Sequence, residues 1–234
     1  MNKKFRTFVV IGSSLSFLVV SAVLIATTRK KIVACIGDSI TFGRGVEETR
    51  NVESYPSFLN DFLGRKYLVK NFGRNGATAL KKSSRPYVEQ KEYKESLKRK
   101  ANVYIVMLGT NDTRPTSWNG CDGPKNFQKD YIDLIETYKN RSKNAQFLLI
   151  QPPKSFRSMT PMTDQTVNND LIKTSISSSI SKAGERLNLP VIDLYGFTEN
   201  HPEWFPDGLH PNAIGNKKIA EYIYKTAKTL TNLW

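Results

Sequence analysis

The chain is poor in the residues that build disulfide scaffolds and metal centres. Its 234 residues include only two cysteines and two histidines. Two cysteines exclude a disulfide-dense scaffold and a four-cysteine zinc site, and two histidines argue against a histidine-rich metal site. With 39% hydrophobic and 11% aromatic residues, the chain is neither disordered nor collagen-like. Its length suits one domain with a sizeable core and is short for two.

Acidic residues are missing from the N-terminal part. The formal net charge is +14, and residues 1–31 contain six basic residues but no Asp or Glu. The remaining basic residues are scattered, without the pattern of a nucleic-acid-binding module. A basic surface suits nucleic acid, an anionic membrane or an anionic substrate. We favour a solvated basic face beside an anionic membrane and expect no nucleic-acid partner.

Charged residues are also absent from Thr7 to Thr28, and Phe8–Ala26 is rich in Val, Leu, Ile and Phe. A helix of about 21 residues spans roughly 31 Å, about the thickness of the bilayer hydrocarbon. We therefore expect residues 1–28 to be a single-pass signal anchor, followed by one domain at residues 29–234 on the extracellular side. A cleaved signal peptide and a secreted protein stay open, although Leu24 stands where cleavage after Ala26 requires a small residue.

Strand-like and helical patterns alternate in the rest of the chain. Apolar, β-rich runs cover Lys31–Ile36, Tyr67–Phe72, Val103–Leu108, Gln146–Ile150 and Pro190–Leu194. Helical patterns cover Tyr55–Leu63, Tyr87–Lys98, Phe127–Arg141, Val167–Leu187 and Ala213–Leu230. This alternation predicts an α/β fold, a parallel sheet covered by helices on both faces. Functional groups of such folds gather at the carboxyl ends of the strands.

The residues after these strands can carry acyl transfer. A serine hydroxyl, here Ser39, needs a base to take its proton before it becomes a good nucleophile. His210 has Asp207 three residues earlier, a spacing that puts both side chains on one face of a turn, where the carboxylate can orient the imidazole. His201 lacks such a partner at that offset and is the poorer candidate. The predicted catalytic residues are therefore Ser39, Asp207 and His210.

Acyl transfer also needs hydrogen-bond donors for the oxyanion of its transition state. The strand ends offer the backbone N–H groups of Ser39 and Gly76 and the side-chain amide of Asn111. One such donor is typically worth about 10²–10³ in turnover. Taken singly, each residue is also an ordinary turn residue, and only their order and placement on separate elements point to an esterase.

Four segments of the chain resemble the motif blocks of the SGNH hydrolase superfamily, also called GDSL esterases. They are Gly37-Asp38-Ser39-Ile40-Thr41, Asn71–Thr78, Gly109-Thr110-Asn111-Asp112 and Asp207–His210. The resemblance covers residues 31 to about 230, and no catalytic position departs from the pattern. It implies a three-layer α/β/α sandwich with a five-stranded parallel sheet, and it implies no metal or organic cofactor.

The substrate is less well determined, because this superfamily includes esterases, thioesterases, lysophospholipases and polysaccharide deacetylases. The stretch from Thr113 to Trp118 and the run around His210 are similar to bacterial carbohydrate O-acetylesterases. Trp118 and Trp204 are tentative substrate-binding residues, since tryptophan can stack on sugars, although plain packing explains them as well. Arg85, Arg114, Lys81 and Lys82 could meet an anionic sugar or headgroup, or be solvated charge.

We therefore expect a serine esterase that hydrolyses short acyl esters, above all acetyl esters, on a carbohydrate. A lysophospholipase or thioesterase, an acyltransferase on the same scaffold and a non-enzymatic binding protein stay open. Cys35 is expected to be buried and inert in the first strand, with a disulfide to Cys121 as an alternative outside the cell.

Overall fold

The computed structural model describes residues 30–231 and 234. Within it, residues 31–234 form one compact unit. The predicted membrane-spanning segment Phe8–Ala26 lies outside the described residues, so the division into residues 1–28 and 29–234 stays a prediction. Across residues 30–231 and 234, we find no helix with the length and apolar character needed to cross a membrane.

The sheet has five parallel strands in the order β2-β1-β3-β4-β5. The strands are β1 (Lys31–Gly37), β2 (Tyr67–Gly73), β3 (Val103–Met107), β4 (Gln146–Ile150) and β5 (Val191–Ile192). This confirms the predicted five-stranded parallel sheet. The first four strands begin where their apolar runs begin, because a strand buried on both faces needs an almost unbroken run of apolar residues.

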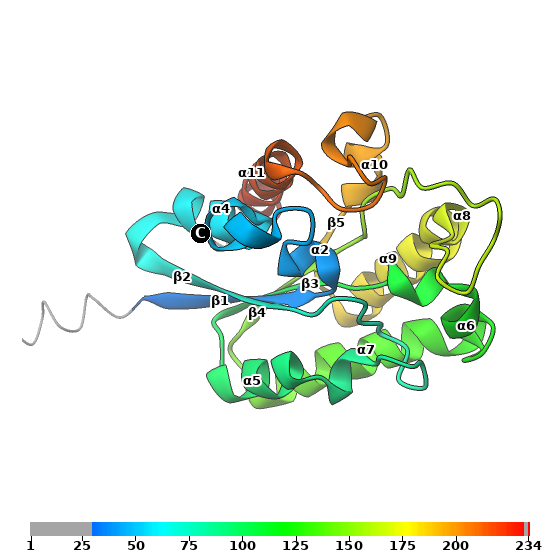
Figure 1. The fold of residues 1–234 in the computed structure, drawn as a ribbon. Helices are drawn as coiled ribbons and strands as arrows, with labels where there is room; N and C mark the ends of the chain where they lie inside the picture. Colours follow the sequence, from blue (N-terminus) through cyan, green and yellow to red (C-terminus); the bar gives the residue numbers. More distant parts are fainter. Residues whose placement is uncertain (1–29, 232–233) are drawn as a thin grey trace, which may run out of the picture. The chain divides into compact units, whose positions relative to one another are not determined.

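Helices cover both faces of the sheet (Figure 1). On one face lie α5 (Lys91–Arg99), α7 (Gly123–Arg141) and α9 (Ser177–Leu187), and on the other lie α4 (Tyr55–Leu63) and α11 (Ala213–Leu230). Successive side chains of a strand point to opposite faces of the sheet. In β1, Ala34 and Ile36 therefore face the first group of helices, and Val33 and Cys35 face the second. The result is the expected three-layer sandwich.

Short elements connect these layers. The short α-helices are α2 (Ser39–Phe42), α3 (Arg50–Glu53), α6 (Pro115–Trp118), α8 (Asn169–Leu171) and α10 (Leu194–Thr198). A π-helical segment spans Ile172–Ile176, and 3-10 turns span Glu47–Thr49, Gly64–Lys66, Tyr87–Glu89, Asn111–Thr113 and Pro202–Trp204. Three of them directly follow strands: α2 follows β1, the turn Asn111–Thr113 follows β3, and α10 follows β5.

Two predicted helices and one strand are shorter or more broken than their patterns indicate. The pattern at Tyr87–Lys98 resolves into a 3-10 turn and α5, because Gln90 between them has extended backbone. The pattern that begins at Val167 becomes helical only at Asn169, since the Asn168 side chain caps the amide of Leu171. β5 ends at Ile192 because the next residue, Asp193, caps α10.

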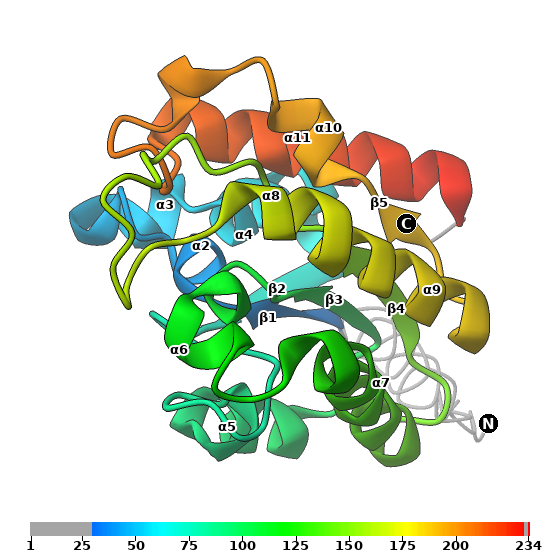
Figure 2. The same cartoon turned by 90° about the vertical axis from the view of Figure 1, so that its right-hand side faces the viewer.

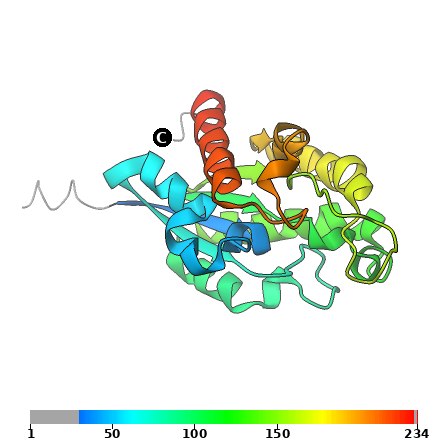
Figure 3. The same ribbon diagram turned by 45° about the horizontal axis from the view of Figure 1, so that its top comes forward.

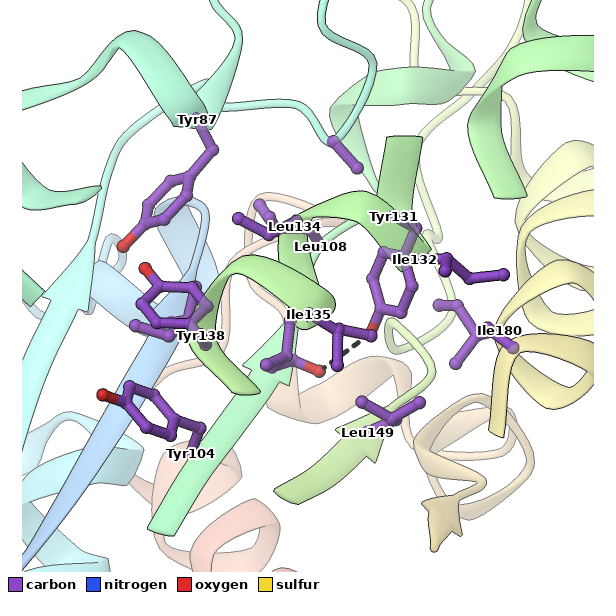
Figure 4. Close-up of a cluster of buried hydrophobic side chains, with 14 of the residues drawn as sticks. Tyr87, Tyr104, Leu108, Tyr131, Ile132, Leu134, Ile135, Tyr138, Leu149 and Ile180 are labelled. Atoms are coloured by element: carbon purple, nitrogen blue, oxygen red, sulfur yellow. Dashed lines mark hydrogen bonds between the residues drawn. The ribbon is translucent and has the colours of Figure 1, made fainter. Parts of the chain in front are cut away.

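Buried tyrosines fill the layer between the sheet and α7 (Figure 4). The ring of Tyr104 on β3 lies 4.7 Å from that of Tyr138 on α7, centroid to centroid. Tyr138 and Ser96 share a hydrogen bond of 2.6 Å, and the hydroxyl of Tyr131 donates to the carbonyl of Val106 at 3.2 Å. Each of these hydroxyls therefore reaches a partner, as a buried polar group must.

The packing between α7 and the sheet leads to a stability prediction. Ile135 on α7 is fully buried, so Ile135→Ala should lower the free energy of unfolding by about 2–5 kcal/mol. Urea denaturation followed by circular dichroism would measure the change. Val52→Ala is the matched control, since Val52 is 62% exposed. An equal effect of the two substitutions would contradict this description of the core.

Candidate active site

The sheet topology marks one place for a site. From β1 the chain goes outward to β2 and then returns to β3 on the other side of β1. Ligands of open α/β sheets bind at such a switch point, outside the carboxyl ends of the strands. Figure 2 looks onto this edge, with α2 directly after β1 and α6 after β3. Two of the four motif segments lie here: Gly37–Thr41 at the end of β1 and Gly109–Asp112 after β3.

Ser39 is held at the first position of α2, immediately beyond β1. The preceding Asp38 caps this helix: its Oδ1 accepts a hydrogen bond of 2.9 Å from the amide of Ile40. Ser39 itself is only 5% exposed. The strand, the cap and the helix turn together fix the direction of the Ser39 side chain, which a nucleophile requires.

The segment between α10 and α11 brings the other two predicted catalytic residues beside α2 (Figure 3). In its turn, Asp207 Oδ1 accepts hydrogen bonds from the amides of Leu209 (2.9 Å) and His210 (2.7 Å). These two bonds fix the carboxylate against its own backbone. Asp207 Oδ2 therefore remains directed at the imidazole three residues later.

The three side chains form a continuous chain of hydrogen bonds. Ser39 Oγ lies 3.0 Å from His210 Nε2, and His210 Nδ1 lies 2.6 Å from Asp207 Oδ2. A carboxylate can only accept, so Nδ1 carries the proton and Nε2 is free to accept the proton of Ser39. Burial lowers the pKa of His210, Asp207 raises it, and the charges of Arg157 and Arg44 lower it further. The net direction is downward, which favours the neutral imidazole that a general base needs.

Arg157 is a further partner of Asp207 that the sequence did not indicate. Its Nη2 lies 2.5 Å from Asp207 Oδ2, and its Nε donates to the Asp207 carbonyl at 2.9 Å. Partial burial by itself would raise the pKa of Asp207, but its hydrogen bonds with His210 and Leu209 hold that pKa well below the usual range. Asp207 therefore stays ionised beside His210.

The predicted oxyanion donors lie on neighbouring segments. Asn111 Nδ2 donates to the carbonyl of Ala77 at 3.0 Å and lies 3.4 Å from Asp38 Oδ2. Asn111 thus contacts the residue next to Gly76 and the residue next to Ser39. Gly76 has a φ of +76°, a backbone conformation that favours glycine. Among the described residues, the Gly76 amide has no acceptor, so it can donate to a ligand.

A buried carboxylate, Asp112, ties the loop after β2 to the end of β3. Its two oxygens accept hydrogen bonds from the amides of Ala79 (3.1 Å) and Leu80 (2.8 Å). Burial raises the pKa of Asp112 to about 7 and that of Asp38 to about 6. The sequence showed Asp112 only as part of its motif block, and the structure assigns it this tethering contact.

A cavity of about 330 Å³ opens beside His210. Its lining residues are Arg44, Gly45, Glu47, Pro206, Asp207 and His210. Neither predicted tryptophan is among them. Trp118 is buried against Phe127, and Trp204 stacks on His201 with 3.8 Å between ring centroids and lines a separate cavity. Their tentative role in substrate binding therefore has no support in the geometry of this cavity.

Residues 33–223 match the family model of the GDSL-like lipases and acylhydrolases. The chain belongs to this family. Its members are carboxylic ester hydrolases, so the family agrees with the reaction class that the serine, the histidine and the carboxylate suggest. The resemblance to GDSL esterases seen in the four motif blocks is confirmed.

Two known proteins are similar in sequence to most of this chain. An acetylxylan esterase of Xylanibacter ruminicola is 33% identical over 211 residues, which cover 84% of this chain and 43% of that protein. The chain thus spans less than half of that relative. A GDSL esterase/lipase of Arabidopsis thaliana is 26% identical over 218 residues, 86% of each chain.

Solved structures share the fold. An acetyl xylan esterase matches with a TM-score of 0.64 at 23% identity and covers 83% of this chain and 98% of its own. A lipase/acylhydrolase from Enterococcus faecalis matches with a TM-score of 0.64 at 22% identity, over 85% of this chain and 96% of its own. At these identities the two structures support the architecture only.

Both cysteines are free thiols and both are buried. Cys35 lies in β1, as expected, and burial raises its pKa to about 12, so it is an inert core residue. Cys121 belongs to the hydrophobic cluster on the α7 side, whereas Cys35 belongs to the cluster on the opposite face of the sheet. The alternative of a disulfide between them is therefore wrong.

The charges around His210 predict the pH dependence of catalysis. The pKa of His210 is lowered from 6.5. We therefore expect kcat/KM for p-nitrophenyl acetate to stay high at mildly acidic pH and to fall only when the pH drops below the lowered pKa of His210. Arg157→Gln removes a positive charge that lowers this pKa, so the acidic limb should move to higher pH.

The matched control for this measurement is Arg186→Gln, an equal loss of charge at an exposed position near the end of α9. Its pH profile should overlay that of the unchanged protein. A shift of the same size in both variants would mean that net charge, and not the Arg157 contact, sets the profile.

Proposed function

We propose that this chain is a serine esterase that removes short acyl groups, above all acetyl, from a carbohydrate. The observation that carries the proposal is the hydrogen-bonded series from Ser39 Oγ through His210 to Asp207, at 3.0 Å and 2.6 Å. This is the arrangement in which a base activates a serine and a carboxylate orients the base. The family supplies the reaction class, ester hydrolysis.

The first half of the reaction acylates the enzyme. Ser39 Oγ attacks the carbonyl carbon of the ester while His210 Nε2 takes the hydroxyl proton, and the carbonyl oxygen becomes an oxyanion. The amides of Ser39 and Gly76 and the side chain of Asn111 are the proposed donors to this oxyanion. The tetrahedral intermediate then expels the alcohol, which receives the proton from His210, and the acyl group remains on Ser39.

The second half repeats these steps with water. His210 takes a proton from water, the resulting hydroxide attacks the acyl carbonyl, and the same donors hold the second oxyanion. Collapse of this intermediate releases the carboxylic acid and returns the proton to Ser39 Oγ. Asp207 stays ionised throughout and stabilises the imidazolium that forms twice in each cycle.

The charged lining of the cavity beside His210 is unsuited to a long acyl chain. The cavity has a volume of about 330 Å³, and its lining includes the charged side chains of Arg44, Glu47 and Asp207. A long acyl chain needs an apolar trough, because burying its methylene groups supplies most of the binding free energy. The acetylxylan esterase relative at 33% identity supports acetyl as the acyl group and a carbohydrate as the alcohol.

Chain-length selectivity tests the proposal. The full chain is assayed against p-nitrophenyl esters from acetate to palmitate, and we expect the highest kcat/KM at acetate. Ser39→Ala should lower kcat by at least about 10³-fold at every length, because no other hydroxyl replaces the nucleophile. A fluorophosphonate should label the unchanged protein on Ser39, as read by mass spectrometry of the peptide.

Ser178→Ala is the control, since Ser178 is an exposed serine on α9, and its activity should equal that of the unchanged protein. Equal activity of Ser39→Ala and Ser178→Ala would overturn the serine-esterase assignment. A Ser39-dependent optimum at octanoate or longer would instead favour a lysophospholipase or thioesterase. Acyl transfer to an added alcohol in preference to water would favour an acyltransferase.

A further inference from the structure

Arginines gather at the carboxyl edge of the sheet, around the three predicted catalytic residues. Arg44 follows α2, Arg85 lies in the loop after β2, Arg114 follows the turn after β3, and Arg157 lies beyond β4. Each comes from the segment after a different strand, so the topology brings them to one edge. The charges of Arg44, Arg85 and Arg157 all act on Arg114.

Arg114 is half-buried, whereas Arg44 and Arg85 are exposed. The Nε of Arg114 is buried and has no hydrogen-bond acceptor among the described residues. Burial lowers the pKa of its guanidinium and the Asp38 carboxylate raises it, whereas the other three arginines lower it further. A buried donor without an acceptor costs free energy, so Arg114 would gain from an acceptor that a ligand supplies. Arg114 itself does not line the cavity beside His210, and its link to that site is its charge interaction with Arg44 and Asp38.

Arg44 stands at the entrance of the cavity. Its amide donates to the carbonyl of Ser39 at 2.9 Å, which keeps its backbone within one turn of the nucleophile. Its side chain lines the cavity together with His210. The carboxylate of Glu47 lies 3.8 Å from its Nε, beyond hydrogen-bond distance, and both side chains are 52% exposed. The Arg44 guanidinium is therefore free to contact a ligand.

The acids at this edge do not balance the four arginines. Three acids face the four arginines. Asp207 is engaged by His210 and Arg157. Asp38, with a pKa of about 6, is mostly ionised at pH 7 and acts on Arg114, and Glu47 lies 3.8 Å from Arg44. In the part of the chain that the structure describes, the Arg85 guanidinium has one hydrogen bond, to the carbonyl of Asn75 at 3.2 Å. The entrance consequently keeps an excess of positive charge, which like-charge repulsion makes unfavourable unless a negative group binds there.

We propose that the ester substrate carries an oxyanion group, a carboxylate or a phosphate, that Arg44 and Arg114 bind beside Ser39. This inference rests on the proposed function and specifies the substrate class of the same site. Because the proposed acyl group is acetyl, the charge belongs to the alcohol part of the ester. Arginine matches both groups, since its planar fork donates two parallel hydrogen bonds to either.

The test compares pairs of acetyl esters in which one member carries an anionic group that the other lacks. Acetylated glucuronic acid is paired with acetylated glucose, and acetylglycerol phosphate with acetylglycerol, and released acetate is measured with the full chain. We expect kcat/KM to be at least about tenfold higher for the charged member of one pair, as charge-assisted hydrogen bonds predict. Which pair shows the preference distinguishes a sugar acid from a phosphate ester.

Arginine variants then show which side chains cause the preference for the charged ester. Arg44→Gln and Arg114→Gln should each reduce the charged-to-neutral ratio of kcat/KM about tenfold, and Arg114→Lys should restore only part of it because lysine lacks the fork. Arg65→Gln is the control, an equal loss of charge in the turn before β2, at the opposite edge of the sheet. It should leave the ratio unchanged.

Arg44 is exposed, so its substitution keeps the test decisive if the Arg114 variants unfold. Ser39-dependent hydrolysis at equal rates for both members of both pairs would overturn this inference and leave the esterase proposal standing. Absence of Ser39-dependent hydrolysis from every acetyl ester would overturn the proposed function itself. A ratio that falls equally in Arg44→Gln and Arg65→Gln would show general steering by net charge and would also overturn the proposed contact.

Discussion

The close backbone approach at the end of β1 is the constraint on which the rest of the site depends. A Cβ added to Gly37 would lie 2.0 Å from Thr41 Oγ1 and 2.6 Å from the Met107 carbonyl, so only glycine fits between β3 and α2. This contact lets the chain turn directly from the strand into α2, with Ser39 at its first position. A larger residue at position 37 would push α2 outward and lengthen the 3.0 Å separation of Ser39 and His210.

Buried carboxylates hold the loops around this turn. Asp38 caps α2 and lies near the Asn111 side-chain amide, while Asp112 accepts hydrogen bonds from the backbone amides of Ala79 and Leu80 in the loop after β2. Burial raises the pKa of Asp38 to about 6 and that of Asp112 to about 7, and the hydrogen bonds from the surrounding amides oppose this rise. Geometry at the nucleophile is thus coupled to the protonation of two groups that do not take part in the proposed reaction.

Apolar runs and turn residues made most of the fold predictable from the sequence. The helix Tyr55–Leu63 begins and ends where predicted, because Pro56 and Gly64 mark its boundaries, and Pro211 marks the start of the helix Ala213–Leu230. The π-helical segment Ile172–Ile176 has no such local signal. Trp118 and Trp204 lie outside the lining of the cavity beside His210, so their role in substrate binding stays a prediction. An aromatic residue near a motif can pack into the core as readily as face a ligand. Arg157 was unpredictable because it lies 50 residues before Asp207, and tertiary folding alone joins them.

The arginines connect substrate binding to the basicity of His210. Arg157 and Arg44 lower the pKa of the imidazole, so the free site holds a neutral but comparatively weak base. An oxyanion bound to Arg44 would cancel part of this positive field and raise the pKa of His210 in the complex. A base that strengthens when substrate binds favours proton transfer from Ser39 at the moment it is needed. The positive charge of the arginines at the cavity would then both bind the alcohol part of the ester and strengthen His210 as a base for the first proton transfer.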